Sequence, residues 1–412
     1  MDTAAPPAET APPHKDWAIV GLIGMGHYLS HFYMLTLPPL FLVWREEFDV
    51  SFGTLGLSIA LMSTVTALGQ TPVGFMVDKY GARPFLVGGT LLMALSIAGM
   101  AFAPSYWVIL ALAVLSGIGN SVIHPADYAI LAGSVDKSRM GRAFSLHTFT
   151  GNLGFATAPP VIAMLLLVMD WRGALLVVGL LGVPVVAAIL WKSRILTDQP
   201  KARDTGPAIS GRDLLLTRPI LLFFAFFLLS AMAGSGFTAF IITVMGELWD
   251  TPLAIASMIL TGYMTGATGG TLIGGWFVDR STRHMPFVIG LTLGAMVLIL
   301  SLSTVPMPGW LPVGVALVAG LMMGSSRTPR DVMLRNAAPP GQVGKVFGFV
   351  SSGLPLGSAV MPVPMGLLLD AGYPHLLLPV VVVLLGLSLF CAGLGNGAAR
   401  ARAAAPRAVA AE

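Results

Sequence analysis

Long apolar stretches with few charges are the feature of this sequence that most limits its possible folds. Only 10% of the 412 residues are Asp, Glu, Lys or Arg, whereas 55% are hydrophobic. Soluble domains carry about 25% charged residues, so the chain lacks the charged surface that a soluble fold needs. Many stretches exceed the roughly 20 apolar residues that cross a bilayer. Because the apolar runs are continuous rather than alternating, we expect membrane-spanning α-helices and not a β-barrel.

The apolar stretches divide into two sets of six predicted spans. The spans are predicted at 17–44, 54–77, 85–103, 106–133, 143–169, 171–191, 219–247, 252–278, 286–305, 310–335, 346–370 and 375–396. The expected fold is an all-α polytopic membrane protein of two pseudo-symmetric six-helix bundles, at 17–191 and 219–396. The remaining segments are an N-terminus expected to be disordered (1–16), a linker (192–218) and a tail (397–412), all expected to be cytoplasmic.

The basic residues indicate how the spans are oriented. If the N-terminus is cytoplasmic, 19 of the 23 Lys and Arg residues fall on the cytoplasmic side. Only Arg45 and Arg172 fall outside, which is a strong positive-inside bias. The other two, Arg327 and Arg330, lie inside a predicted span, where topology does not explain them. We therefore predict a multi-pass protein of the cell inner membrane with both termini in the cytoplasm.

Several protein classes are disfavoured by what the sequence lacks. The single cysteine, Cys391, excludes an internal disulfide framework and a cysteine metal cluster. The N-terminus lacks the basic start and short apolar core of a cleavable signal. No phosphate-binding Gly-Lys-Ser/Thr loop supports ATP drive, and no soluble domain can hold an enzyme site. The net charge of +4 reflects loops between spans and does not indicate nucleic-acid binding. We expect no enzyme activity and no cofactor.

The two halves repeat one another at an offset of 201 to 204 residues. Each of the following pairs joins the first half to the second: Gly74-Phe-Met-Val-Asp78-Lys79 and Gly275-Trp-Phe-Val-Asp279-Arg280; Pro125-Ala-Asp127 and Pro329-Arg-Asp331; Gly141-Arg-Ala-Phe144 and Gly344-Lys-Val-Phe347; Gly154 with Pro159 and Gly357 with Pro362. Parallel six-span repeats place a substrate site between the halves, near the middle of the membrane.

The loop after the second span resembles the signature loop of the major facilitator superfamily, a family of secondary transporters. Its pattern is Gly-x-x-x-Asp-Lys/Arg-x-Gly-x-Arg, and the loop after span 8 repeats it with Ser281-Thr282 in place of the glycine. The resemblance covers roughly 17–396 and implies that each loop aspartate faces a helix N-terminus in the opposite half, where a carboxylate is favourable. It implies that the two loops latch the outward-facing state and that the protein is a monomer. The gating residues expected on this basis are Gly74, Asp78, Lys79, Arg83, Asp279, Arg280 and Asp331.

A narrower resemblance is to the fosmidomycin-resistance branch of that superfamily. Span 4 carries His124-Pro125-Ala-Asp127, and span 5 carries Gly151-Asn152-Leu-Gly154. The branch usually places Glu directly after His-Pro, whereas here Asp127 comes one residue later. Ala158 also replaces the second glycine of the span-5 motif of drug/proton antiporters. The branch implies export by antiport.

Span 1 carries two histidines near its centre. The i,i+4 spacing of His27 and His31 puts them on one helix face, and histidine can carry a proton near neutral pH. One interpretation is a cavity-facing proton site. Another is a pair of neutral imidazoles that hydrogen-bond to neighbours such as Tyr28 or Ser30. Two histidines at this spacing can also bind zinc, but no acidic or cysteine ligand lies nearby in sequence, so we expect no metal site.

Span 10 carries Arg327 and Arg330, the two arginines that membrane topology does not explain. Arginine stays charged and matches a carboxylate or phosphate in a forked geometry. Arg327, with Arg330, is therefore a candidate for binding an anion in the cavity. The alternative is a structural ion pair, because Arg327 and Asp331 are also i,i+4.

Spans 4 and 5 supply the remaining polar candidates. His124 and Asp127 are predicted to handle a proton, and His124 also to contact substrate. Asp127 has the alternative of pairing with a basic residue of a signature loop. Asn152 and Tyr28 are further candidates for lining the cavity, whereas a structural role is the better interpretation of His147.

These residues together predict a proton-coupled transporter of a small organic, anionic solute that works by alternating access. Export by antiport is favoured, and import by symport is the alternative. A hypothesis of another class is a non-transporting membrane sensor or scaffold. The expected partners are a small-molecule substrate, protons and the lipid bilayer.

Overall fold

A computed structural model describes residues 13–136, 139–196, 215–278, 280–338, 346 and 349–404. The first half contains α1 (Pro13–Met34), η1 (Pro38–Leu40), α2 (Phe41–Phe48), α3 (Phe52–Tyr80), α4 (Ala82–Met100), α5 (Tyr106–Ser121), α6 (Ile123–Ser134), α7 (Met140–Leu165), α8 (Trp171–Leu180), α9 (Gly182–Trp191) and η3 (Ser193–Ile195). The second half contains α11 (Arg218–Trp249), α12 (Leu253–Val278), α13 (His284–Thr304), α14 (Leu311–Ser325), α15 (Arg327–Ala337), α17 (Gly353–Val360), α18 (Pro362–Asp370) and α19 (Pro374–Ala404).

The predicted helical membrane fold is confirmed. Within the described ranges, ten helical segments are long and apolar enough to cross a membrane. The predicted spans 5 and 8 correspond to α7 and α12, which have 26 residues each. The expected linker and tails lie partly outside the described residues, so those boundaries stay predictions.

Span 1 is broken after Met34, four residues before Pro38, and four further spans are broken helices in the same way, with a proline accounting for each break. The helices α5, α8, α14 and α17 end at Ser121, Leu180, Ser325 and Val360. In each case a proline stands four residues later, at 125, 184, 329 and 364. Proline has no N–H to donate to the carbonyl four residues earlier, so the helix loses that hydrogen bond. The breaks in spans 4 and 10 fall at corresponding positions of the repeat.

Glycines allow two helices of the second half to pack backbone to backbone. A Cβ at Gly262 would lie 2.9 Å from the carbonyl oxygen of Val313, and Gly266 and Gly270 face the backbone of α14 in the same way. Gly320 of α14 meets the carbonyl of Tyr263 in return. The Gly-x-x-x-Gly spacing on span 8 is therefore a packing feature.

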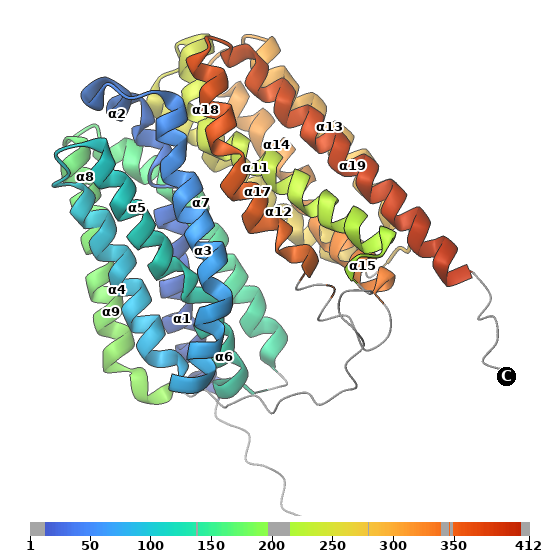
Figure 1. The fold of residues 1–412 in the computed structure, drawn as a ribbon, viewed down its shortest axis with the longest axis horizontal. Coiled ribbons are helices and arrows are strands. Elements are labelled where there is room, and N and C mark those ends of the chain that lie inside the picture. Colours follow the sequence, from blue (N-terminus) through green and yellow to red (C-terminus); the bar gives the residue numbers. More distant parts are fainter. Residues whose placement is uncertain are drawn as a thin grey trace, which may run out of the picture.

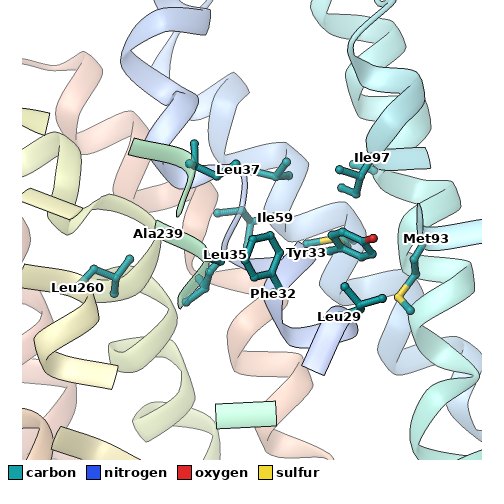
Figure 2. Packing of buried hydrophobic residues seen from close by; sticks show 14 of the residues in the cluster. Leu29, Phe32, Tyr33, Leu35, Leu37, Ile59, Met93, Ile97, Ala239 and Leu260 are labelled. Carbon is teal, nitrogen blue, oxygen red and sulfur yellow. The ribbon is translucent and has the colours of Figure 1, made fainter. Parts of the chain in front are cut away.

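The two bundles lie side by side, close together at one end and apart at the other (Figure 1). The end at which they diverge is here called the basic end, because the C-terminal ends of α3, α9 and α15 carry Lys79, Lys192 and Arg335. The opposite end, which carries α2 and α18, is here called the outer end. One apolar core joins both halves, and Figure 2 shows part of it, from Met93 and Ile97 of α4 to Ala239 and Leu260 of the second half.

Candidate functional site

A cavity of about 430 Å³ lies between the two halves. The first half contributes Met34, Ile59, Asn152 and Phe155 to its wall, among others. The second half contributes most of the polar groups, which are Ser230, Ser235, Thr238, Tyr263, Thr292, Ser326, Arg327, Arg330, Ser358 and Ser388. The cavity therefore has an apolar wall with hydroxyl groups and cations concentrated on one side, which is typical of a small-molecule site.

The two arginines of the cavity differ in their partners. Arg330 donates from Nε to Asp331 Oδ1 at 3.0 Å, and its guanidinium lies 4.1 Å from the centre of the Phe227 ring. Among the described residues, no carboxylate pairs with Arg327. The alternative of an ion pair between Arg327 and Asp331 is not what the structure shows, because Asp331 is directed toward Arg330 instead.

Arg327 owes its place to the break in span 10. It is the first residue of α15, directly after Ser326. The start of a helix carries a partial positive charge, so it favours an anion in addition to the guanidinium. Interrupted helices of this kind commonly line the substrate site of transporters.

A second polar group, here called the histidine cluster, consists of His27, His31, His124 and His147. The ring centres of His27 and His31 are 4.4 Å apart, and His124 lies 5.2 Å from His27. His147 stacks on His27 at 3.7 Å. The four rings come from α1, α6 and α7, so residues far apart in sequence meet inside the first bundle.

Hydrogen bonds fix the inner side of this cluster. His27 Nδ1 donates to the carbonyl of His147 at 2.8 Å, and His147 Nε2 lies 2.8 Å from Oδ2 of the fully buried Asp127. Because Nδ1 of His27 carries the proton, Nε2 of the neutral ring has a free lone pair. Asp127 pairs with His147 rather than with a signature loop.

Three ring nitrogens of the cluster have no hydrogen-bond partner among the described residues. They are His27 Nε2, His31 Nδ1 and His124 Nδ1. The ligating nitrogens of these three histidines all lie within 4.8 Å of one another, close enough that a transition metal ion could also bridge them. The expectation of no metal site considered only two of these histidines, and it stays a prediction.

The histidine cluster lies behind one aromatic ring of the cavity wall. Phe155 lines the cavity, and its ring centre lies 4.2 Å from that of His31. Asn152 lines the cavity one turn away, as expected. Tyr28 and His124 are not in the wall, because the Tyr28 hydroxyl bonds Thr157 at 2.7 Å and His124 belongs to the cluster. Contact of these two with substrate stays a prediction.

The gating residues at the basic end do not reach the opposite half where their side chains are described. Lys79 lies over Tyr80 and Arg280 over Trp276, each on its own helix or just beyond it. Arg83 donates to the carbonyl of Leu196 in its own half. Gly74 has open space beside it. The side chain of Asp78 and the whole of Asp279 lie outside the described residues, so the predicted latch is not tested.

The outer end holds the polar contacts between the halves that the structure shows among described residues. Asp370 accepts from the backbone N–H groups of Phe52 and Gly53 at 2.6 and 2.8 Å. Arg45 pairs with Glu247 at 3.3 Å, with both side chains more than one third exposed. The structure is thus closed at the outer end and wider at the basic end.

Sequence reasoning missed two parts of this arrangement. The structural role predicted for His147 stays a prediction, but its contacts with His27 and Asp127 were not predicted, and its position as a polar residue inside a span was a usable signal. Asp370 was not singled out at all, because a charge at the edge of a span is ordinary.

Comparison with known proteins gives consistent matches over most of the chain. The family model described as Major Facilitator Superfamily matches residues 19–248 and 227–409. The fosmidomycin resistance protein of Escherichia coli K12 is 26% identical over 369 residues, which cover 86% of this chain and 88% of that protein. The multidrug resistance protein MdtH of Photorhabdus laumondii is 27% identical, over 73% of this chain and 74% of that protein.

The solved structures that match show the same fold. A bacterial homologue of the human lysosomal transporter Spinster, crystallised in an inward-facing and unoccupied conformation, superposes with a TM-score of 0.76 at 13% identity. The match covers 95% of this chain and 98% of that chain.

Proposed function

Because this chain belongs to the major facilitator superfamily, we propose that it is a proton-coupled secondary transporter of a small organic anion. It works by alternating access between the two bundles, in the cell inner membrane, as a monomer. The positive-inside rule makes the basic end the cytoplasmic end, with both termini there. The closed outer end and the wider basic end then correspond to an inward-facing state.

The proposal that the substrate is an anion rests on Arg327. An arginine inside a membrane protein is costly, and such residues pair with a partner or serve the transported substrate. Arg330 already has Asp331 and the Phe227 ring, whereas Arg327 has no carboxylate partner among the described residues. A carboxylate or phosphate group of the substrate would supply the missing partner of Arg327, in a forked geometry. The cavity hydroxyls and Asn152 would then bind the polar remainder.

The histidine cluster supports proton coupling. Three unpartnered ring nitrogens lie together, and the ring of His31 touches the cavity wall through Phe155. A proton can be accepted by His27, His31 or His124 and shared with the pair of His147 and Asp127. Since the anion and the proton bind on opposite sides of Phe155, occupancy of one site can influence the other.

Export by antiport is the favoured direction. It is supported by relatives whose names denote resistance to fosmidomycin or to several drugs. Uptake by symport is the second candidate, because an unpaired arginine would bind an imported anion equally well. Proteoliposomes with an imposed pH gradient of either sign separate the two. Antiport moves solute against the proton flow, and symport moves it along the proton flow.

The anion site is tested by Arg327→Ala, with Arg330→Ala as the matched control. A thermal-shift screen of organic anions and antibiotics on purified protein, at two pH values, first identifies a ligand. Arg327→Ala should abolish the shift caused by that ligand, and Arg330→Ala should weaken it less. If Arg327→Ala is folded and binds the ligand as wild type does, the anion site is wrong.

The proton site is tested separately by His31→Gln. This variant should bind the ligand but lose accumulation driven by a pH gradient. Unchanged gradient-driven transport, or a stoichiometric metal ion found in the purified wild-type protein, would refute the assignment of the cluster to protons.

A further inference from the structure

We propose that Asp370 is the latch that holds the outer end closed, and that its release from α3 is required for the outward-facing state. The inference rests on the alternating access of the proposed function, but not on the identity of the substrate or the coupling ion. It concerns Asp370, which does not line the cavity and is not a member of the histidine cluster.

Asp370 completes the capping of a helix that belongs to the other half. The first N–H groups of a helix have no partner within the helix. In α3, the N-cap residue Ser51 accepts from Thr54 N–H within its own half. The N–H groups of Phe52 and Gly53 are taken by the two carboxylate oxygens of Asp370, at 2.6 and 2.8 Å. Hydrogen bonds of this kind, to a charged acceptor, are the stronger ones.

The position of Asp370 on its own helix is unfavourable. It is the last residue of α18, where the carbonyl end of the helix carries a partial negative charge. The carboxylate is therefore stabilised by the start of α3 and not by its own helix. Asp370 is also exposed, so water can hydrate the carboxylate when the contact breaks. A bond that is strong when made and easily hydrated when broken suits a reversible latch.

Two glycines bring the backbones close enough for this contact. A Cβ at Gly56 of α3 would lie 2.6 Å from the carbonyl oxygen of Pro362, and a Cβ at Gly366 would meet the carbonyl of Phe52. No side chain separates α3 from α18 at these points. With the outer end closed, the two backbones are in contact, and the carboxylate of Asp370 reaches α3 in this state.

Span 2, which is formed by α3, has a matching aspartate at its other end. The start of α3 meets the end of α18, so the two run antiparallel, and the last turn of α3 contains Asp78 of the signature loop. The family resemblance implies that Asp78 faces the start of span 11 in the outward-facing state. Spans 2 and 11 thus each end in an aspartate suited to cap the start of the other span, and rocking of the halves would allow only one of the two caps at a time.

The test measures the conformational equilibrium directly. In the full-length chain with Cys391→Ser, spin labels at Lys192 and Asn336 report the width of the basic end by pulsed electron–electron distance measurements. Wild type should show mainly the long distance. Asp370→Ala should raise the ratio of short to long distances at least about fivefold, since losing a helix cap typically changes an equilibrium by that order.

Asp170→Ala is the matched control. Asp170 lies between spans 5 and 6, and it caps α8 of its own half by accepting from Gly173 N–H at 2.8 Å. Its loss removes a similar bond at the same end but joins nothing across the halves, so the distance ratio should stay that of wild type. Gly366→Ala keeps the carboxylate but separates the helices, and it should shift the ratio in the same direction as Asp370→Ala.

The proposal is overturned if Asp370→Ala keeps the wild-type distances, or if Asp170→Ala shifts them equally. If Asp370→Ala does not fold, Gly366→Ala decides, and unchanged distances in that variant overturn the proposal. Because no substrate or gradient is used, a failure of the anion or proton assignment leaves the result unaffected.

Discussion

Gly151 gives the sharpest test of the histidine cluster, because it faces two of its rings. A Cβ added there would lie 2.5 Å from Cε1 of His27 and 2.8 Å from Cε1 and Nδ1 of His31. Neither ring can move freely. His27 is held by its bond to the His147 carbonyl, and Phe155 lies against His31. Gly151→Ala should therefore displace the rings on which proton coupling depends.

The magnitude follows from two opposing effects. Adding a methyl group to a packed interior costs about 1–3 kcal/mol. Replacing glycine by alanine within a helix stabilises that helix by roughly 0.5–1 kcal/mol. Gly151→Ala should therefore lower the free energy of unfolding by about 0–2.5 kcal/mol and disturb the histidine cluster. Gly21→Ala on α1 is the control, because a Cβ there meets no atom of the described residues within 4 Å and only the favourable effect remains.

The assay combines stability with transport. Thermal unfolding of the purified variants, followed by intrinsic tryptophan fluorescence, should place Gly151→Ala below Gly21→Ala. Proteoliposome transport by Gly151→Ala should lose its dependence on the pH gradient, whereas Gly21→Ala should retain it. The reasoning is refuted if Gly151→Ala is as stable as Gly21→Ala and transports with the wild-type response to pH.

Three further outcomes are expected from other parts of the structure. Arg327→Lys keeps the charge but loses the forked geometry, so ligand affinity measured by calorimetry should fall at least about tenfold, and unchanged affinity would argue against a bidentate contact. Arg45→Ala breaks an exposed ion pair worth at most about 1 kcal/mol, so it should shift the spin-label distances less than Asp370→Ala does. Gly320→Ala should lower the unfolding temperature relative to Gly314→Ala. A Cβ at residue 320 meets the Tyr263 carbonyl, whereas a Cβ at residue 314 meets no described atom within 4 Å. Equal unfolding temperatures would contradict the backbone packing of α12 and α14.

Hydropathy and charge predicted the helical membrane fold because lipid leaves a chain few alternatives. The same information located Arg327, since a charge inside an apolar run is conspicuous. The broken helices were not predicted, although the prolines at 125 and 329 each stand four residues after a break. That rule alone is insufficient, because α3 continues through Pro72 and α19 through Pro379.

The histidine cluster could be predicted only in part. The i,i+4 spacing identified the face shared by His27 and His31, since both lie on one helix. The contacts of His124 and His147 with His27 depend on how α6 and α7 pack against α1, and no local sequence pattern predicts that packing. The pairing of Asp127 with His147 is likewise a tertiary contact.

The two aspartates near the outer end, Asp170 and Asp370, have different partners in the two repeated halves. Asp170 lies between the last two spans of its half, Asp370 is the last residue of the span before the final one in its half, and each caps a helix. Asp170 directly precedes α8 and caps it, whereas α19 begins only at Pro374, after a turn through Gly372 with φ of +78°. The displaced start of α19 leaves Asp370 available to the opposite half. A short change in one connection thus separates an aspartate that caps a helix of its own half from one that joins the two halves.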